Sequence, residues 1–516
     1  MHLAKRASAT RGRLHASNVG ARTRAGATVQ EVHVNTRSLS SFEPLVGEGR
    51  VRALEQRGRA LHQRLGKRVV WNISSTATGG GVAEMLHSLL RYARQLSFDA
   101  RWLVIDGTPG FFHITKRIHN ALHGSRGDGT PLGRDERALF EAVSQSNTAA
   151  LQTLVQPRDI VVCHDPQTAG LIPALLRRGA LVIWRCHIGH EQHESIEVER
   201  GWQFLRPYIE EVPLAVFSRA AYAPSWVRGK RTMVIPPNID PFSAKNLSMT
   251  PEAARAILSF VGLIDKSADD DGAPEFMRDD ASVSRMARKA DMLRVGQPPA
   301  ADTPLVVQVS RWDAMKDPLG VLHGFTRLIT HGPTVQAELV LAGPGTRAVT
   351  DDPEGAQVFG ELQQAYLALP EAQRRRVHLA LLPMDDIEEN AAIVNALQRH
   401  AHVIVQKSLV EGFGLTVTEA LWKGRPVIAS AVGGILDQIR DGTDGLLLHD
   451  PSDLGAFAAL MRRVLDDPSL ARRLGQAGYE RVRDHFLSIS ALELWAGLLE
   501  QLTEHEQRSL SHRAAP

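Results

Sequence analysis

The most constraining feature of this sequence is a regular alternation of short apolar runs with amphipathic stretches. Six runs lie between residues 68 and 240: VVWNIS, WLVID, DIVVCHD, ALVIWRCHI, LAVFS and MVIPPNID. A second series follows residue 303: LVVQVS, AELVLAG, VHLALL, HVIVQ, RPVIAS and DGLLL. Apolar strands joined by helical crossovers form parallel sheets covered by helices on both faces. The sequence therefore predicts an α/β protein with two Rossmann-like, doubly wound parallel-sheet domains that face each other across a cleft.

The length and the two series set the expected domain boundaries. A chain of 516 residues is long enough for two or more domains. We expect a disordered basic tail over 1–30, an N-terminal Rossmann-like domain over 31–245, a linker with a polar insertion over 246–302 and a C-terminal Rossmann-like domain over 303–485. A final helix and tail would occupy 486–516.

Composition excludes several classes of protein. The chain is 43% apolar and 23% charged, which is ordinary for a soluble globular protein. A net charge of +3, evenly spread, does not predict binding to nucleic acid. Cys163 and Cys186 lie in strand-like runs and are interpreted as reduced core thiols, not as a disulfide or metal ligands. No run approaches the ~20 apolar residues that a membrane-spanning helix requires, so we expect no membrane partner.

The first thirty residues contain six Lys or Arg and no Asp or Glu. That composition is shared by transit peptides and by disordered basic tails, and it lacks the apolar centre of a secretory signal. We favour a basic tail on a cytoplasmic protein.

Residues 264–302 fit neither series. Asp269, Asp270 and Asp271 stand together there, with further charges and a Pro-Pro pair. Consecutive acids in a polar segment usually face solvent, so we interpret them as part of a solvated insertion and not as a metal site.

Two glutamates, Glu411 and Glu419, stand eight residues apart within HVIVQKSLVEGFGLTVTEALWKGRPVI. HVIVQ predicts a strand, Gly412 and Gly414 predict a loop, and helical spacing begins at Leu415. Glu411 would then lie at the carboxyl end of a strand and Glu419 in the next helix, at the edge where open α/β sheets bind ligands. The glycines let a ligand approach the backbone, and the helix start offers N–H groups to an anion.

Two cations, Arg311 and Lys316, follow the strand LVVQVS, and a glycine loop (Gly79, Gly80 and Gly81) follows the first strand. Surface cations and a flexible strand–helix turn are the alternative interpretation. Two carboxylates, two cations and a helix N-terminus at one edge of the second sheet favour a site for a phosphorylated, hydroxyl-rich ligand.

The E-x7-E segment with its upstream cations resembles that of retaining glycosyltransferases of the two-domain GT-B type. Longer phrases narrow the resemblance to the trehalose glycosyltransferring synthases. These phrases are NISSTATGGGVAEMLHSLL (72–90), VVCHDPQTAGLIP (161–173), WRCHI (184–188), QVSRWDAMKDPLGV (308–321) and QKSLVEGFGLTVTEALWKGRPVIASAVGG (406–434). The similarity extends from about residue 31 to about residue 486.

The resemblance implies roles for individual residues. Arg311 and Lys316 would neutralise the leaving diphosphate, so no metal or other cofactor is expected. Glu411 would position the donor sugar without acting as a nucleophile, and Glu419 would accept ribose hydroxyls. The implied donor-binding residues are Gly79, Gly80, Gly81, Arg311, Lys316, Gly412, Gly414, Leu415, Thr416 and Glu419.

The resemblance also makes His164 the fourth catalytic candidate, beside Glu411, Arg311 and Lys316, and places Asp165 and His187 in the acceptor pocket. A histidine at a strand end is, without that resemblance, more often structural. After WRCHI the family commonly has an acid, whereas this chain has Gly189-His190. The C-terminal domain would bind the nucleotide sugar, the N-terminal domain would bind the acceptor, and the last helix would return to the N-terminal domain.

The implied activity is the retaining, reversible transfer of glucose from a nucleoside-diphosphate glucose to D-glucose, which gives α,α-trehalose. Three alternatives stay open: a trehalose phosphorylase that uses phosphate and glucose 1-phosphate, a transferase that makes another α-glucoside, and a sugar-nucleotide sensor without turnover. The sequence does not specify the donor base (ADP, UDP or GDP) or the assembly, for which a homodimer is one option.

Overall fold

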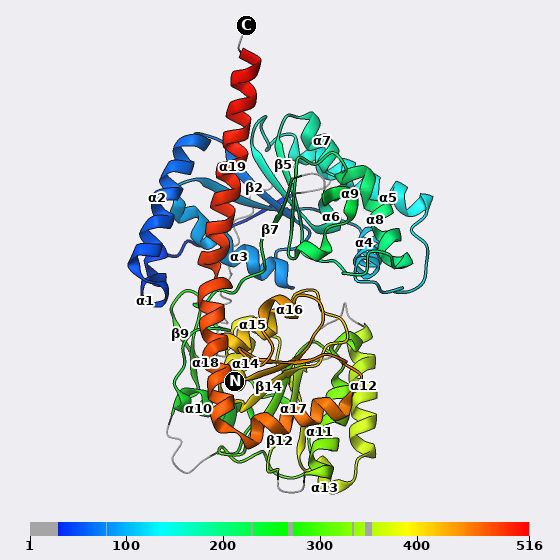
Figure 1. Cartoon of the computed structure of the whole chain (residues 1–516), viewed down its shortest axis with the longest axis vertical. Coiled ribbons are helices and arrows are strands. Elements are labelled where there is room, and N and C mark those ends of the chain that lie inside the picture. Colours follow the sequence, from blue (N-terminus) through cyan, green and yellow to red (C-terminus); the bar gives the residue numbers. More distant parts are fainter. Residues whose placement is uncertain are drawn as a thin grey trace, which may run out of the picture.

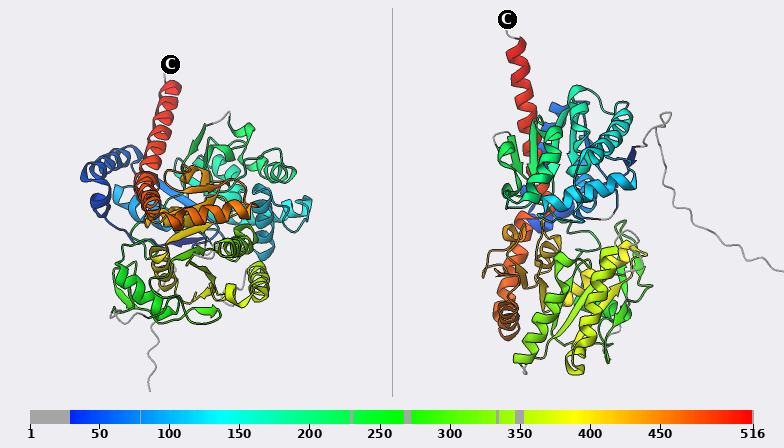
Figure 2. Two further views of the ribbon diagram at one scale, coloured as in Figure 1. Left: turned by 60° about the horizontal axis from the view of Figure 1, so that its bottom comes forward. Right: turned by 90° about the vertical axis from the view of Figure 1, so that its right-hand side faces the viewer.

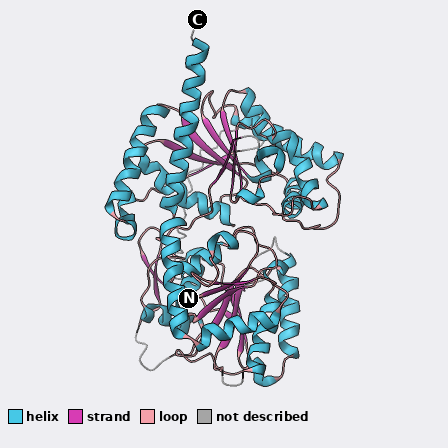
Figure 3. Ribbon diagram, in the orientation of Figure 1, coloured by secondary structure: helices cyan, strands magenta, loops and turns pink. Residues whose placement is uncertain are grey.

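The computed structural model describes residues 29–78, 80–228, 231–266, 272–332, 335–345 and 353–514. Most of the predicted basic tail therefore lies outside the described residues. Two α/β domains are stacked along the longest axis of the molecule, each with a central sheet and helices on both faces (Figure 1, Figure 3). The predicted fold class, two Rossmann-like parallel-sheet domains, is confirmed.

The N-terminal domain is built on a seven-stranded sheet with the order β1-β3-β2-β4-β5-β6-β7. Only β1 of this sheet runs antiparallel to its neighbour, and the interior strands β4 and β6 are buried at every residue, as parallel strands covered on both faces must be. The six apolar runs of the first series overlap β2 to β7. The strands are β1 (Gln30–Val32), β2 (Val69–Ser74), β3 (Asp99–Val104), β4 (Ile160–His164), β5 (Leu181–Cys186), β6 (Leu214–Phe217) and β7 (Arg231–Val234).

Helices cover both faces of this sheet. The predicted helix after the first strand is α3, whose apolar face packs into the core of the domain. The helices are α1 (Glu43–Val46), α2 (Glu48–Leu65), α3 (Gly81–Ala93), α4 (Pro109–Leu122), α5 (Arg134–Leu151), α6 (Asp165–Ala169), α7 (Ile172–Arg177), α8 (Ile196–Ile209) and α9 (Ser225–Arg228).

The C-terminal domain has a second seven-stranded sheet, with the order β10-β13-β12-β11-β14-β15-β16. The six runs of the second series correspond to its parallel strands, and β10 is an added antiparallel edge strand. The sheet strands are β10 (Asp291–Leu293), β11 (Leu305–Val309), β12 (Glu338–Pro344), β13 (Val377–Leu382), β14 (Val403–Gln406), β15 (Val427–Ser430) and β16 (Leu446–Leu448). The helices are α10 (Pro251–Val261), α11 (Pro318–His331), α12 (Pro353–Ala368), α13 (Glu371–Arg374), α14 (Ile387–His400), α15 (Leu415–Trp422), α16 (Ile435–Gln438), α17 (Leu454–Asp466), α18 (Pro468–His485) and α19 (Ser488–Ala514).

The segment expected to be a solvated insertion is partly built into the fold. It contains a hairpin of β8 (Glu275–Met277) and β9 (Val283–Arg285), and it supplies β10 to the second sheet. Phe276 and Met286 are buried in the main core cluster. Two apolar side chains and an edge strand thus anchor a segment whose other residues are polar.

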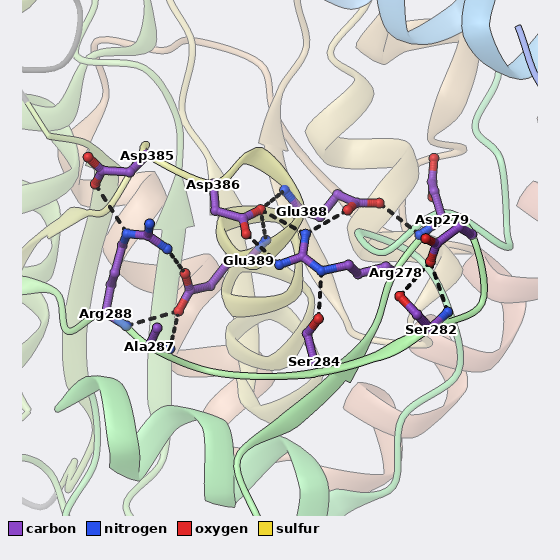
Figure 4. Close-up of polar contacts among 11 residues, drawn as sticks. Arg278, Asp279, Ser282, Ser284, Ala287, Arg288, Asp385, Asp386, Glu388 and Glu389 are labelled. Atoms are coloured by element: carbon purple, nitrogen blue, oxygen red, sulfur yellow. Dashed lines mark hydrogen bonds and ion pairs between the residues drawn. The ribbon is translucent and has the colours of Figure 1, made fainter. Parts of the chain in front are cut away.

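Ion pairs fix this hairpin to the start of α14 (Figure 4). Arg278 contacts the carboxylates of Asp386 at 2.5 Å and Glu388 at 2.8 Å. The buried carboxylate of Glu389 accepts hydrogen bonds from the backbone N–H groups of Ala287 (2.5 Å) and Arg288 (2.9 Å). Carboxylates are favourable at a helix N-terminus, so both the helix and the arginines stabilise them.

The last helix, α19, joins the domains. It leaves the C-terminal domain and runs along α2 and α3 of the N-terminal domain (Figure 1, Figure 2). Arginines of α2 and of the turn after it pair with glutamates of α19, in the pairs Arg50–Glu493 (2.7 Å), Arg57–Glu500 (2.7 Å), Arg64–Glu504 (2.8 Å) and Arg68–Glu506 (2.7 Å).

Candidate active site

Lys316 and Glu411 meet at the carboxyl edge of the second sheet. Lys316 closes a short 3-10 turn after β11, and Glu411 lies in the loop after β14. The Nζ of Lys316 is 2.5 Å from Glu411 Oε2, and Ser408 Oγ donates to the same oxygen at 3.1 Å. Because β11 and β14 are adjacent parallel strands, their ends bring together residues that are 95 positions apart. The prediction placed both residues at this edge.

Arg311 lies beside this pair in the sequence, in the segment between β11 and the turn that holds Lys316. Its side chain is 66% exposed, and its Nη2 is 3.6 Å from Asp313 Oδ2. A guanidinium carries five N–H donors, and one long ion pair leaves most of them available to a ligand. Arg311 can therefore offer an anion a charged, directional contact.

Glu419 lies in α15 as predicted, but it is only 3% exposed. Its Oε1 is 3.3 Å from Lys245 Nζ. Burial raises the pKa of Glu419, and the charges of Lys245 and Lys423 oppose that rise. In the described part of the chain its ion pair is made with Lys245, and not with Arg311 or Lys316.

Glycines shape the loop between Glu411 and α15. Gly414 caps the helix with a φ of +87°, a conformation that side-chain-bearing residues rarely adopt. A Cβ on Gly433 would lie 1.7 Å from the carbonyl oxygen of Glu411, so this position must be glycine to let the two loops touch. Thr416, in the first turn of the helix, donates to Gln406 Oε1 at 3.2 Å.

The starts of two helices converge here from opposite domains. A Cβ placed on Gly81, the first residue of α3, would lie 3.2 Å from Leu415 Cδ1, at the first residue of α15. Gly80 precedes α3 with a φ of +83°. Gly79 lies outside the described residues. Unpaired N–H groups at helix starts attract anions, so this junction suits a diphosphate.

His164 and His187 are hydrogen-bonded to each other at the carboxyl edge of the first sheet. Asn72 Nδ2 donates to a backbone carbonyl at 3.4 Å, so its Oδ1 faces His164 Nε2 at 3.2 Å and Nε2 carries the proton. His164 Nδ1 then accepts from His187 Nε2 at 3.0 Å. Burial lowers the pKa of His164 to about 3 and lowers that of His187, so both imidazoles are neutral.

Asp165 binds the main chain beside this histidine pair. Its carboxylate accepts the backbone N–H of His187 at 2.7 Å, and its φ is +61°. Burial raises the pKa of Asp165 to about 7. This geometry shows a residue that orients the loop carrying His187.

Sequence reasoning missed a second pair of histidines. His119, in α4, and His123, just after it, make an edge-to-face contact, with their ring centroids 4.6 Å apart. The ring of His123 approaches Gly412, since a Cβ there would lie 3.2 Å from His123 Cε1. Burial lowers the pKa of both, to about 4 for His123. Their spacing of four residues in an amphipathic helix was the available signal, but it carries no information about the partner domain.

Two further residues of the N-terminal domain, Tyr222 and Arg219, contact the second domain at the cleft and were also missed. The hydroxyl of Tyr222 donates to the carbonyl of Gly412, in the loop after Glu411. Arg219 is paired with Glu191 and, at 2.6 Å, with Asp437 of α16. Neither has a sequence signal, because each contact depends on how the domains meet.

A pocket of about 180 Å³ opens between the domains beside Glu411. Its lining from the N-terminal domain includes His190, Glu191 and Tyr222, and its lining from the C-terminal domain includes Leu409 and Gly433. No Lys or Arg is among its lining residues. The pocket therefore suits a small uncharged polar molecule next to the acid that pairs with Lys316.

The residues described here contain no group of three or more His, Cys, Asp or Glu side chains that could hold a metal ion. Asp269, Asp270 and Asp271 lie outside that part of the chain. No described helix is long and apolar enough to cross a membrane.

Comparison with known proteins agrees with this geometry. Residues 72–224 match the family described as "Trehalose synthase, N-terminal domain", and residues 293–481 match "Glycosyl transferases group 1". The trehalose synthase of Pyrococcus horikoshii is 31% identical over 474 residues, which cover 92% of this chain and 99% of that protein. The trehalose synthase of Rubrobacter xylanophilus is 33% identical over 468 residues, with 89% and 96% covered.

More distant proteins share the fold. A trehalose phosphorylase of Pleurotus pulmonarius is 26% identical over 91% of this chain and 61% of its own length. The crystal structure of an α,α-trehalose-phosphate synthase (UDP-forming) from Burkholderia vietnamiensis superposes with a TM-score of 0.61 at 15% identity, covering 84% of this chain and 99% of that one. With its two sheets, its paired Lys316 and Glu411 and these relatives, the chain belongs to the trehalose synthase family of glycosyltransferases.

Proposed function

We propose that this protein is a retaining glucosyltransferase that transfers glucose reversibly from a nucleoside-diphosphate glucose to D-glucose and forms α,α-trehalose. The observation that carries the proposal is the contact of Lys316 with Glu411 at the edge of the second sheet, next to the exposed Arg311. Relatives named trehalose synthase support the product.

The cations account for departure of the nucleotide. As the glycosidic bond breaks, negative charge develops on the leaving diphosphate. Lys316 and Arg311 would stabilise that charge more strongly in the transition state than in the ground state, which is the condition for a faster reaction. The helix starts at Gly81 and Leu415 would add N–H donors. We therefore propose that the reaction needs no metal ion.

Glu411 would position the donor sugar and oppose the positive charge that develops on it. Its Oε2 already accepts hydrogen bonds from Lys316 and Ser408, which weakens that oxygen as a nucleophile. Retention would then follow from reaction on one face of the sugar, with a leaving phosphate oxygen taking the proton of the incoming hydroxyl.

The pocket beside Glu411 favours free glucose over a phosphorylated acceptor. Its lining residues include Glu191 and Glu411 and no Lys or Arg, and negative charge nearby disfavours a phosphate there. The nearby Arg219 is already paired with two carboxylates. Contact between the domains through Tyr222 would exclude water, which otherwise competes as the acceptor.

A steady-state assay tests the proposal. Purified enzyme is supplied with ADP-, UDP- or GDP-glucose, with D-glucose or glucose 6-phosphate as acceptor, and without added metal or with a chelator. We expect nucleotide release and α,α-trehalose only with free glucose, unaffected by the chelator. Breakdown of trehalose that needs phosphate and no nucleotide would instead identify a phosphorylase, whose phosphate the same cations could hold.

A further inference from the structure

Lys245 is a partly buried cation that neither the motifs nor the proposed chemistry uses. It lies in the segment that connects the two domains, eleven residues after the last residue of β7. Its ammonium contacts two carboxylates at once: Glu84 Oε1 at 2.8 Å and Glu419 Oε1 at 3.3 Å. Glu84 lies in the first turn of α3, and Glu419 lies in α15. The Lys245 side chain therefore bridges these two helices.

The environment of Glu419 explains why a cation is needed there. A carboxylate can accept both vicinal hydroxyls of a ribose only while it is ionised. Burial favours the protonated form and raises the pKa of Glu419, as does the charge of Glu84, whereas Lys245 and Lys423 lower it. Burial lowers the pKa of Lys423, whose ammonium bonds Asn246 Oδ1 (3.0 Å) and the backbone carbonyl of Glu419 (3.1 Å). Lys245 is thus the cation in direct contact with the carboxylate among the described residues.

We propose that Lys245 is a positioning residue for the nucleotide: its ammonium, which Glu84 of α3 also contacts, holds the Glu419 carboxylate in place for the ribose hydroxyls. This inference rests on the proposed nucleotide-sugar donor. It assigns a donor-binding function to the connecting segment, which belongs to neither sheet.

Binding of nucleoside diphosphates to the full-length protein tests the inference without requiring turnover. The probes are ADP, UDP and GDP, followed by the 2′,3′-dideoxy form of the one that wild type binds most tightly. We expect Lys245→Met to weaken binding of the ribose form on the order of 10- to 100-fold, the effect of impairing a charged hydrogen-bonding group. The dideoxy form should bind wild type and variant with similar, weak affinity.

Two comparisons separate this role from a purely structural one. Lys245→Arg, which keeps the charge, should restore part of the affinity, and Lys67→Met at an exposed site should change nothing. In Lys245→Met the affinity should fall more steeply than in wild type as pH falls, because Glu419 then becomes protonated at a higher pH, whereas protonation of the terminal phosphate affects both proteins alike. Circular dichroism confirms that each variant is folded.

The outcomes distinguish the inference from the proposed function. If wild type binds no nucleoside diphosphate, the proposed nucleotide-sugar donor is wrong, and the role of Lys245 loses its basis. Wild type that binds and prefers the ribose form, with Lys245→Met showing the same affinity, preference and pH profile, would overturn the role of Lys245 and leave the donor intact.

Discussion

Two clusters of cations and carboxylates in the C-terminal domain look alike in sequence, but they differ in how completely their charged groups are paired with one another. One joins the β8–β9 hairpin and the residues just after it to α14 (Figure 4). There Arg278 contacts two carboxylates, and the Glu389 carboxylate accepts hydrogen bonds from two backbone N–H groups and an arginine. The other surrounds Lys316 and Glu411 in the cleft, where Arg311 stays 66% exposed with one long ion pair.

The difference shows how an ionic cluster becomes a binding site. In the hairpin cluster the groups satisfy one another, so that their effect is to anchor a segment to a helix. In the cleft, Lys316 follows a strand end and pairs with Glu411, which lines a pocket between the domains, and Arg311 stays largely exposed. A ligand can complete the bonding of the second cluster but has little to add to the first.

The largest effect should follow removal of a cleft cation. Lys316→Met and Arg311→Met should each lower kcat for trehalose formation about 100-fold or more, since each would stabilise charge that develops on the leaving group. The assay is steady-state kinetics with the preferred donor. Arg375→Met, a surface arginine of the same domain paired with Glu371, is the matched control and should retain wild-type kinetics. Equal kcat for Lys316→Met and the control would place the chemistry elsewhere.

Removal of a carboxylate from the hairpin cluster should change stability and leave catalysis intact. Glu389→Ala deprives two partly buried backbone N–H groups of their acceptor, which should cost no more than about 1–3 kcal/mol in the free energy of unfolding. Urea unfolding measures the loss, and Glu371→Ala on the surface should lose much less. A Glu389→Ala protein that is fully stable but inactive would contradict the assignment of this cluster to structure.

The buried histidines of the first domain should make stability depend on pH. The pKa of His164 is lowered from 6.5 to about 3, so the neutral form is favoured in the fold. Its contribution is fully present above pH 6.5 and is lost as pH falls toward 3, at about 1.4 kcal/mol per pH unit. Urea unfolding at pH 7, 6 and 5 should show a smaller decline for His164→Asn than for wild type. An identical decline in both proteins would show that another group is responsible.

The smallest effect is expected on the outer surface, between α2 and α19. Arg64 and Glu504 form an ion pair at 2.8 Å with side chains 37% and 45% exposed. Exposed pairs contribute about 0.2–1 kcal/mol and are screened by salt. Arg64→Met should therefore lower the free energy of unfolding by no more than that, and the difference should vanish in 1 M NaCl. A loss that persists in salt would point to packing of the arginine stem.

The candidate site could be predicted only in part, because motifs record local geometry. The E-x7-E segment located Glu411 at a strand end and Glu419 in the next helix, and both positions agree with the structure. Nothing in the sequence paired Glu419 with Lys245, since that contact crosses the junction of the domains. His123 and Tyr222 were missed for the same reason: each approaches Gly412 from the opposite domain.

The sequence by itself determined the two doubly wound sheets, because strands covered on both faces must be apolar along their length and each leaves a recognisable run. It also determined which strand ends carry charged and glycine-rich segments. Only the tertiary structure decided which of these ends meet. Lys316 reaches Glu411 because β14 lies next to β11 although β12 and β13 intervene in the chain. The short strand β10 also depended on the fold, since three residues at a sheet edge are too few to show a periodic pattern.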